Sequence, residues 1–214
     1  MKAIVFDWDG TLVDTLPAIT RANAAVLESY GLPFDPDAYR AAYSPDWQEM
    51  YVRLGVERRL IAEAGARWLD AYAAEMDGVR PMPRAEEALG RLSDAGLAMG
   101  LVTAGDRAVV EDQLHTTGLG RFLPVRVCGE DLPVMKPHPA PLRTALAALG
   151  LADAPERTAY IGDAQDDMRM ARTVGARGVG VVSMLGTRED LVAAGASDVV
   201  ESVADWVDAF LAAR

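Results

Sequence analysis

The 214-residue sequence contains very little cysteine, histidine or lysine. Cys128 is its only cysteine, so no internal disulfide can form, as is usual in a reducing compartment. No apolar run approaches the roughly 20 residues that a transmembrane helix requires. The first residues also lack the pattern of a signal peptide. We therefore expect a cytoplasmic protein.

Positive charge is scarce, and nearly all of it is arginine. The chain has 21 basic and 32 acidic residues, which gives a net charge of −11. Such a charge repels phosphate backbones and anionic membranes, so we expect neither a nucleic-acid nor a membrane partner. Lys2 and Lys136 are the only lysines. An ammonium retained at position 136 indicates a need for a compact charge there, with chance retention as the alternative.

Short apolar runs alternate with helical patterns along most of the chain. The first run, residues 3–6, ends directly at Asp7 and is typical of a buried parallel strand. Similar runs follow at 98–103, 125–128, 158–161, 178–182 and 198–200. Amphipathic helical stripes that end at Gly96, Gly150 and Gly175 separate several of them. This alternation predicts an α/β fold with a Rossmann-like parallel sheet and helices on both of its faces.

Residues 14–80 interrupt the alternation. They carry helical patterns and no clear strand, and Pro81-Met82-Pro83 marks the return to the α/β rhythm. We therefore predict an inserted all-α domain at 14–80, with the core formed by residues 1–13 and 81–214. The sequence does not distinguish a monomer from a homodimer.

Polar residues follow several predicted strands directly. Asp7 and Asp9 end the first, Thr103 and Ala104 the second, and Gly162-Asp163 the fourth, with Asp167 four residues later. Ligands of open parallel sheets bind at the carboxyl ends of the strands, so these groups should meet at one edge. Each residue alone has a simpler interpretation, because Asp and Gly are common in turns and Asp163 could cap a helix.

The chemistry of such a cluster is restrictive. Neighbouring carboxylates repel one another, and a divalent cation relieves the repulsion. All-oxygen ligands favour Mg²⁺ or Ca²⁺, and Mg²⁺ is the usual ion where phosphate is handled. A cation, a lysine, a threonine and loop N–H groups together suit a phosphoryl group, and a carboxylate can be the nucleophile.

These motifs resemble those of the haloacid dehalogenase superfamily, in order and across the whole chain. The segment from Asp7 to Asp14, Asp-Trp-Asp-Gly-Thr-Leu-Val-Asp, is similar to the first motif. Thr103 corresponds to the second motif, Lys136 to the third, and Gly162-Asp163 with Asp167 to the fourth. The helical segment 14–80 resembles the cap of this superfamily, and the phosphoglycolate-phosphatase-like members are the most similar.

The resemblance implies a role for each acid. Asp7 would be the nucleophile and a Mg²⁺ ligand. Asp9 would protonate the leaving oxygen, then activate water, and give its backbone carbonyl to the metal. Asp163 would bind the metal directly, and Asp167 through water or by orienting the site.

The resemblance also implies how the phosphate is held. Thr103 would hydrogen-bond the phosphoryl group, and Lys136 would neutralise charge on Asp7 and the phosphate. Backbone N–H groups of Trp8, Asp9 and Ala104 would complete the cradle. Ala104 departs from the asparagine that many relatives carry, which removes a side-chain contact but keeps the backbone donor.

Several branches of the superfamily fit poorly. Asp9 argues against a dehalogenase, which needs no such acid. Residues 14–80 contain neither lysine nor histidine. The missing lysine argues against the phosphonate-cleaving branch, whose members need a lysine in the cap. The missing histidine disfavours, without excluding, a sugar phosphomutase, whose members use a histidine in the cap. A phospho-accepting signalling or binding protein of another class stays open, although no acceptor Asp follows the third strand. We therefore expect a Mg²⁺-dependent phosphatase acting on a small phosphorylated metabolite through an aspartyl-phosphate.

Overall fold

The structure, a computed structural model, describes residues 1–44, 46–75 and 78–214. They divide into two compact units. The first consists of Met1–Asp14 and Arg80–Arg214, and the second of Thr15–Val79. The predicted helical segment 14–80 therefore includes three residues outside the described part.

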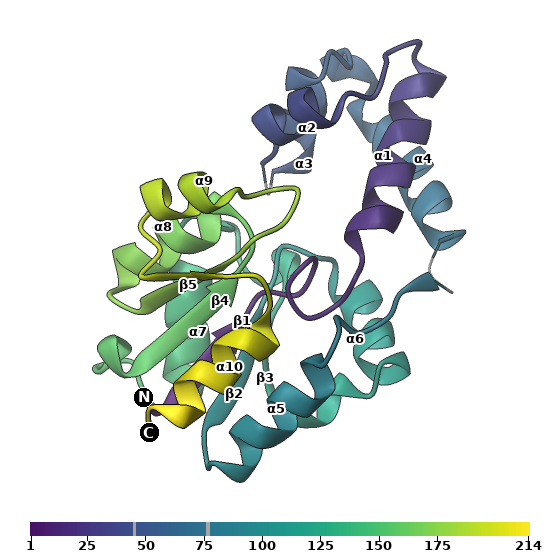
Figure 1. Cartoon of the computed structure of the whole chain (residues 1–214). Coiled ribbons are helices and arrows are strands. Elements are labelled where there is room, and N and C mark those ends of the chain that lie inside the picture. Colours follow the sequence, from purple (N-terminus) through teal and green to yellow (C-terminus); the bar gives the residue numbers. More distant parts are fainter. Residues whose placement is uncertain (45, 76–77) are drawn as a thin grey trace. The chain divides into compact units, whose positions relative to one another are not determined.

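A parallel sheet forms the centre of the first unit (Figure 1). Its strands, in chain order, are β1 (Ala3–Phe6), β2 (Ala98–Val102), β3 (Val125–Val127), β4 (Thr158–Gly162), β5 (Arg177–Val181) and β6 (Asp198–Val200). Within the described residues the order across the sheet is β3-β2-β1-β4-β5-β6. All six strands coincide with predicted apolar runs to within a residue or two, so the predicted α/β fold class is confirmed.

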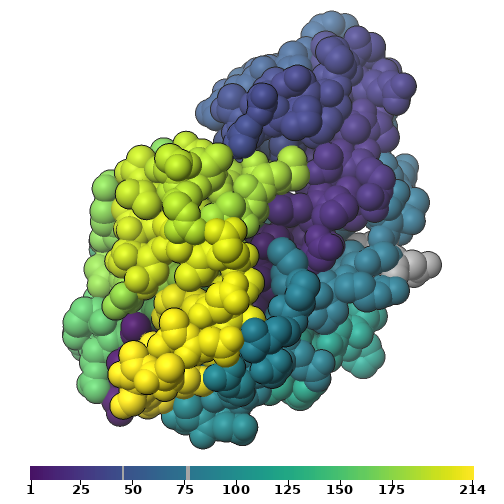
Figure 2. Space-filling view, in the orientation of Figure 1, coloured from purple at the N-terminus to yellow at the C-terminus, as the bar shows by residue number. Residues whose placement is uncertain are grey.

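Helices cover both faces of this sheet, as expected for parallel strands. They are α5 (Ala85–Asp94), α6 (Arg107–Thr116), α7 (Ala140–Ala148), α8 (Gln165–Val174), α9 (Arg188–Ala194) and α10 (Val203–Ala212). Helices α7 and α8 pack on one face, where Val5 and Tyr160 meet Leu146 and Met170 in the core. Helices α5 and α10 lie side by side on the other face (Figures 1 and 2).

The strand order reverses at β1, which makes the gap between β1 and β4 the switch point of the sheet. Strand β1 pairs with β2 on one side and with β4 on the other, so Phe6 lies level with Leu101 and Ile161. Asp7 and Asp163 therefore leave adjacent strands at the same edge. This is where open α/β sheets bind ligands.

The second unit is helical. Its helices are α1 (Leu16–Ser29), α2 (Pro36–Ala42), α3 (Trp47–Arg53) and α4 (Ile61–Ala73). Its interior is partly polar, since Tyr51 donates a 2.6 Å hydrogen bond to Asn23, and Asn23 donates one of 3.1 Å to Tyr39. Within the described ranges, no helix is both long and apolar enough to cross a membrane.

Candidate active site

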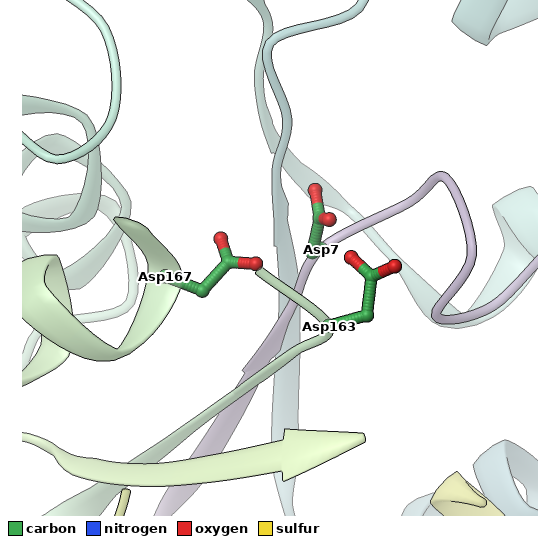
Figure 3. A group of neighbouring side chains, drawn as sticks. All are labelled: Asp7, Asp163 and Asp167. Carbon is green, nitrogen blue, oxygen red and sulfur yellow. The ribbon is translucent and has the colours of Figure 1, made fainter. Parts of the chain in front are cut away.

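Three buried carboxylates converge at the switch point of the sheet (Figure 3). Asp7 follows β1, Asp163 follows β4, and Asp167 lies in the first turn of α8. One oxygen from each lies within 4.8 Å of the other two. The sequence left open that Asp163 caps the helix that carries Asp167. Instead α8 begins at Gln165 and Ala164 is its N-cap residue, so a turn of the chain brings Asp163 to Asp167.

Lys136 is the cation of this cluster. Its Nζ lies 2.7 Å from Asp7 Oδ1 and 2.9 Å from Asp167 Oδ1, and the side chain is only 6% exposed. Burial disfavours the charged ammonium, but the Asp167 and Asp7 carboxylates outweigh it and raise the Lys136 pKa well above its usual value. Lys136 therefore carries a full positive charge between two acids.

The negative charge of the cluster exceeds what Lys136 can neutralise. If all three carboxylates were ionised, the single ammonium would leave an excess of two negative charges. Burial, despite the opposing effect of Lys136, raises the pKa of Asp7 from 3.8 to about 7. Burial, with Asp7 and Asp167 nearby, raises the pKa of Asp163 well above its ordinary value. The site thus favours any bound species that supplies positive charge.

One carboxylate oxygen of Asp163, Oδ2, is buried without a hydrogen-bond partner among the described residues. The nearby Ser183 hydroxyl favours the charged carboxylate and so opposes the rise in the Asp163 pKa. An unpartnered buried carboxylate oxygen is costly unless something binds it. The all-oxygen donor set, with more carboxyl groups than the one ammonium can pair, and this free oxygen fit a hard divalent cation such as Mg²⁺.

Asp167 is held on both of its oxygens. Oδ2 accepts a 3.0 Å hydrogen bond from the Ala164 N–H, and Oδ1 accepts from Lys136 and from the Tyr160 hydroxyl at 3.1 Å. The closeness of Asp167 to β4 requires Gly162, because a Cβ there would lie 2.4 Å from Asp167 Oδ2. Both carboxylate oxygens of Asp167 are therefore already hydrogen-bonded within the protein.

The segment after Asp7 folds into a tight loop. The Trp8 carbonyl accepts hydrogen bonds from the N–H groups of Thr11, Leu12 and Val13 at 2.9–3.2 Å, and Gly10 has a φ of +71°. The Trp8 indole donates a buried 2.6 Å hydrogen bond to Gln113 of α6. These contacts fix the loop that carries Asp9.

Thr103 and Asp9 approach each other across Gly105. The Thr103 hydroxyl accepts a 3.0 Å bond from the Gly105 N–H. A Cβ on Gly105 would lie 3.3 Å from Thr103 Oγ1 and 3.6 Å from Asp9 Oδ2. In the described part of the chain, the backbone N–H groups of Trp8 and Ala104 have no acceptor, so they are available to a ligand.

Sequence reasoning missed three polar residues that support the cluster: Tyr160, Ser183 and Gln113. Ser183 could have been found, since it follows β5 at the same edge as the predicted acids. Tyr160 lies inside a strand and Gln113 inside a helix. In the sequence both are indistinguishable from residues that only fill the core.

The chain is similar to several known proteins. The phosphoglycolate phosphatase of Yersinia pseudotuberculosis is 29% identical over 189 residues, which cover 85% of this chain and 81% of that protein. A hydrolase from Pseudomonas syringae has a similar structure, with a TM-score of 0.86, 24% identity and 99% of each chain covered. A Thermotoga maritima protein, provisionally assigned as a β-phosphoglucomutase, matches with a TM-score of 0.78 and 24% identity over 100% of both chains. At these identities the two solved structures establish the fold alone.

The family match extends over most of the chain. Residues 4–181 match the family described as haloacid dehalogenase-like hydrolase. This range includes Asp7, Asp9, Thr103, Lys136, Asp163 and Asp167. The chain therefore belongs to the haloacid dehalogenase-like hydrolase family.

Proposed function

We propose that this protein is a Mg²⁺-dependent phosphatase that hydrolyses a small phosphomonoester through an aspartyl-phosphate on Asp7. The observation that carries the proposal is the buried cluster itself. Asp7 lies 2.7 Å from a buried ammonium, in a site that holds three carboxyl groups and one ammonium. Together with a cation, such a site provides a nucleophile and the positive charge that phosphoryl transfer requires.

The residues present suit Mg²⁺. Carboxylate oxygens of Asp7 and Asp163 and the backbone carbonyl of Asp9 would hold the ion, with Asp167 acting through water. When bound, the ion would neutralise phosphate oxygens and reduce their repulsion toward the anionic nucleophile. The predicted role of Asp167 agrees with its three hydrogen bonds, which leave its oxygens little freedom to turn toward the ion.

The chain's own residues supply the remaining chemistry. A carboxylate oxygen of Asp7 forms a bond to phosphorus as the bond to the leaving oxygen breaks, and Asp9 gives that oxygen its proton. Asp9 then takes a proton from water as the water oxygen attacks phosphorus, which releases phosphate and restores Asp7. Thr103, Lys136 and the free N–H groups of Trp8 and Ala104, with that of Asp9, hold the phosphoryl oxygens in both steps.

We further propose that the substrate resembles phosphoglycolate and that the helical unit, residues 15–79, is a cap. The phosphoglycolate phosphatase relative supports this substrate class. The helical unit is inserted directly after the loop that carries Asp7 and Asp9, as a cap would be. Its sequence contains no histidine or lysine, which argues against a phosphomutase that uses a cap histidine.

A phosphate-release screen tests the function. We expect steady multiple-turnover release of phosphate from a panel of small phosphomonoesters with Mg²⁺, and none when EDTA replaces it. Ranking the panel by kcat/KM would place two- and three-carbon phosphates, including phosphoglycolate, highest. Stoichiometric phosphorylation without release would indicate a signalling switch instead. Isomerisation of a sugar phosphate without net release would indicate a phosphomutase.

Replacing Asp9 by asparagine should trap the covalent intermediate. The amide introduced by Asp9→Asn cannot take a proton from water, so turnover should fall by about 10²- to 10⁴-fold while a good leaving group still departs. Intact-protein mass spectrometry after mixing with an aryl phosphate should then detect one added phosphoryl group. If the variant still releases the aryl alcohol but never carries phosphate, Asp9 is not the base for the second step.

A further inference from the structure

One residue close to the cluster has no part in the proposed reaction. Tyr160 lies in β4, is fully buried, and belongs to the same hydrophobic core cluster as Leu142, Leu146 and Met170. Its hydroxyl, however, lies at the polar edge of this core. It is 3.1 Å from Asp167 Oδ1 and 3.0 Å from the backbone carbonyl oxygen of Val102.

The two partners of this hydroxyl belong to different parts of the site. Val102 is the last residue of β2 and immediately precedes Thr103, whereas Asp167 lies on α8. Strand β1, which ends just before Asp7, separates β2 from β4 in the sheet. The Tyr160 hydroxyl thus connects the end of β2 with α8 past the strand that carries the nucleophile.

Both partners of the hydroxyl are acceptors, and a phenol has one proton to donate. The carboxylate is the stronger acceptor because it is charged. Asp167 Oδ1 also accepts from Lys136 at 2.9 Å. Tyr160 and Lys136 therefore hold the same oxygen of Asp167, and only one of them, Lys136, also touches Asp7.

We propose that Tyr160 is a positioning residue for phosphoryl transfer. Its hydroxyl holds the Asp167 carboxylate in place, and Asp167 in turn holds the Lys136 ammonium against Asp7. The proposal rests on the proposed phosphatase function. Lysine has a long, flexible side chain, and the ammonium is a compact charge that needs anchoring to stay in one place. Asp167 provides one of its two anchors.

Without the Tyr160 hydroxyl, Lys136 would be the one remaining donor to Asp167 Oδ1 among the described residues. Oδ2 would keep its hydrogen bond from the Ala164 N–H. Asp167 could turn about that single point and draw the ammonium away from Asp7. Displacements on the order of 1 Å in a catalytic group can cost about a hundredfold in rate.

The variant Tyr160→Phe tests this inference, because it removes the hydroxyl and keeps the ring that fills the core. With Mg²⁺ saturating, and on whichever phosphomonoester the wild type hydrolyses, we expect kcat to fall by about 10- to 100-fold. KM should change little, since charge neutralisation by Lys136 matters most in the transition state.

Thr158→Val is the matched control. Thr158 is fully buried at the other end of the same strand, and its hydroxyl has no hydrogen-bond partner in the described residues. This variant should keep kcat within about twofold of wild type, because its hydroxyl contacts nothing in the site. Thermal unfolding of both variants shows whether each remains folded at the assay temperature.

A double-mutant cycle distinguishes positioning from a general packing role. In an Asp167→Asn background the anionic acceptor is gone, so Tyr160→Phe should cost less than about threefold in kcat. An equal cost in both backgrounds, or an unchanged kcat in the single variant, would overturn the inference. Failure of the wild type to release phosphate would instead overturn the proposed function, so the two failures are distinguishable.

Discussion

Replacing Asp7 by asparagine should lower the rate of phosphate release by at least about a thousandfold, because an amide is a very poor nucleophile toward phosphorus. The change keeps the size and shape of the side chain at the end of β1, where Asp7 is almost completely buried. Release from the best substrate of the panel, with saturating Mg²⁺, measures the effect. Asp153→Asn, which makes the same chemical change at an exposed residue far along the sequence, should keep full activity.

The same variant should not be less stable than wild type when metal is absent at pH 8. Burial raises the pKa of Asp7 to about 7, above its ordinary value of 3.8. A raised pKa means that the folded protein binds this proton more tightly than the unfolded chain. The contribution of Asp7 to the free energy of unfolding therefore falls as pH rises from about 4 to about 7. The amide introduced by Asp7→Asn resembles the protonated acid and avoids this loss.

Thermal unfolding in EDTA at two pH values measures this contribution. At pH 8 the variant should melt at or above the wild-type temperature. At pH 4 most of this advantage should disappear, because Asp7 then carries its proton in the folded state and, with an ordinary pKa of 3.8, in somewhat less than half of the unfolded chains. The difference in melting temperature between variant and wild type at each pH removes the contribution of groups that titrate identically in both proteins. Near-wild-type hydrolysis by a clean preparation would exclude Asp7 as the nucleophile. A large loss of stability at pH 8 would show that its contact with Lys136 dominates.

Replacing Lys136 by methionine should damage both stability and activity. Methionine fills a similar volume but leaves three buried carboxylates without a cation. Removing one partner of a buried ion pair costs about 3–5 kcal/mol. At about 2–4 °C per kcal/mol for a chain of this size, the melting temperature in EDTA at pH 8 should fall by about 6–20 °C. Hydrolysis should fall at least about a hundredfold, since charge on the phosphoryl group is no longer neutralised.

Mg²⁺ and acid should each restore part of the stability of Lys136→Met. Mg²⁺ neutralises the carboxylates, and at low pH their raised pKa values let them take up protons. Neither should restore full hydrolysis, because the ammonium beside Asp7 is still missing. Lys2→Met is the matched control, since Lys2 is the other lysine of the chain and is exposed. Equal melting temperatures for the two variants in EDTA would contradict the electrostatic role of Lys136.

Strand positions were predictable because they depend on short-range patterns. Buried parallel strands show as continuous apolar runs, and residues 3–6, fully buried in β1, are such a run. The position of Asp7 at the sheet edge follows from the same pattern, because parallel strands place their carboxyl ends together. Lys136 lies in no strand, and its unusual residue type was the signal that singled it out. Its two carboxylate partners, 129 and 31 residues away in the chain, come from the structure.

By itself, the sequence determined the fold class and the residues able to supply phosphate chemistry, because apolar periodicity, strand ends and motif spacing are local properties of the chain. Only the tertiary structure decided which of these residues contact one another. The order β2-β1-β4 brings the Tyr160 hydroxyl to both Val102 and Asp167, and the turn before α8 brings Asp163 to Asp167. Such contacts depend on the order and register of strands that are far apart in the sequence. Local residue patterns do not encode that order or register.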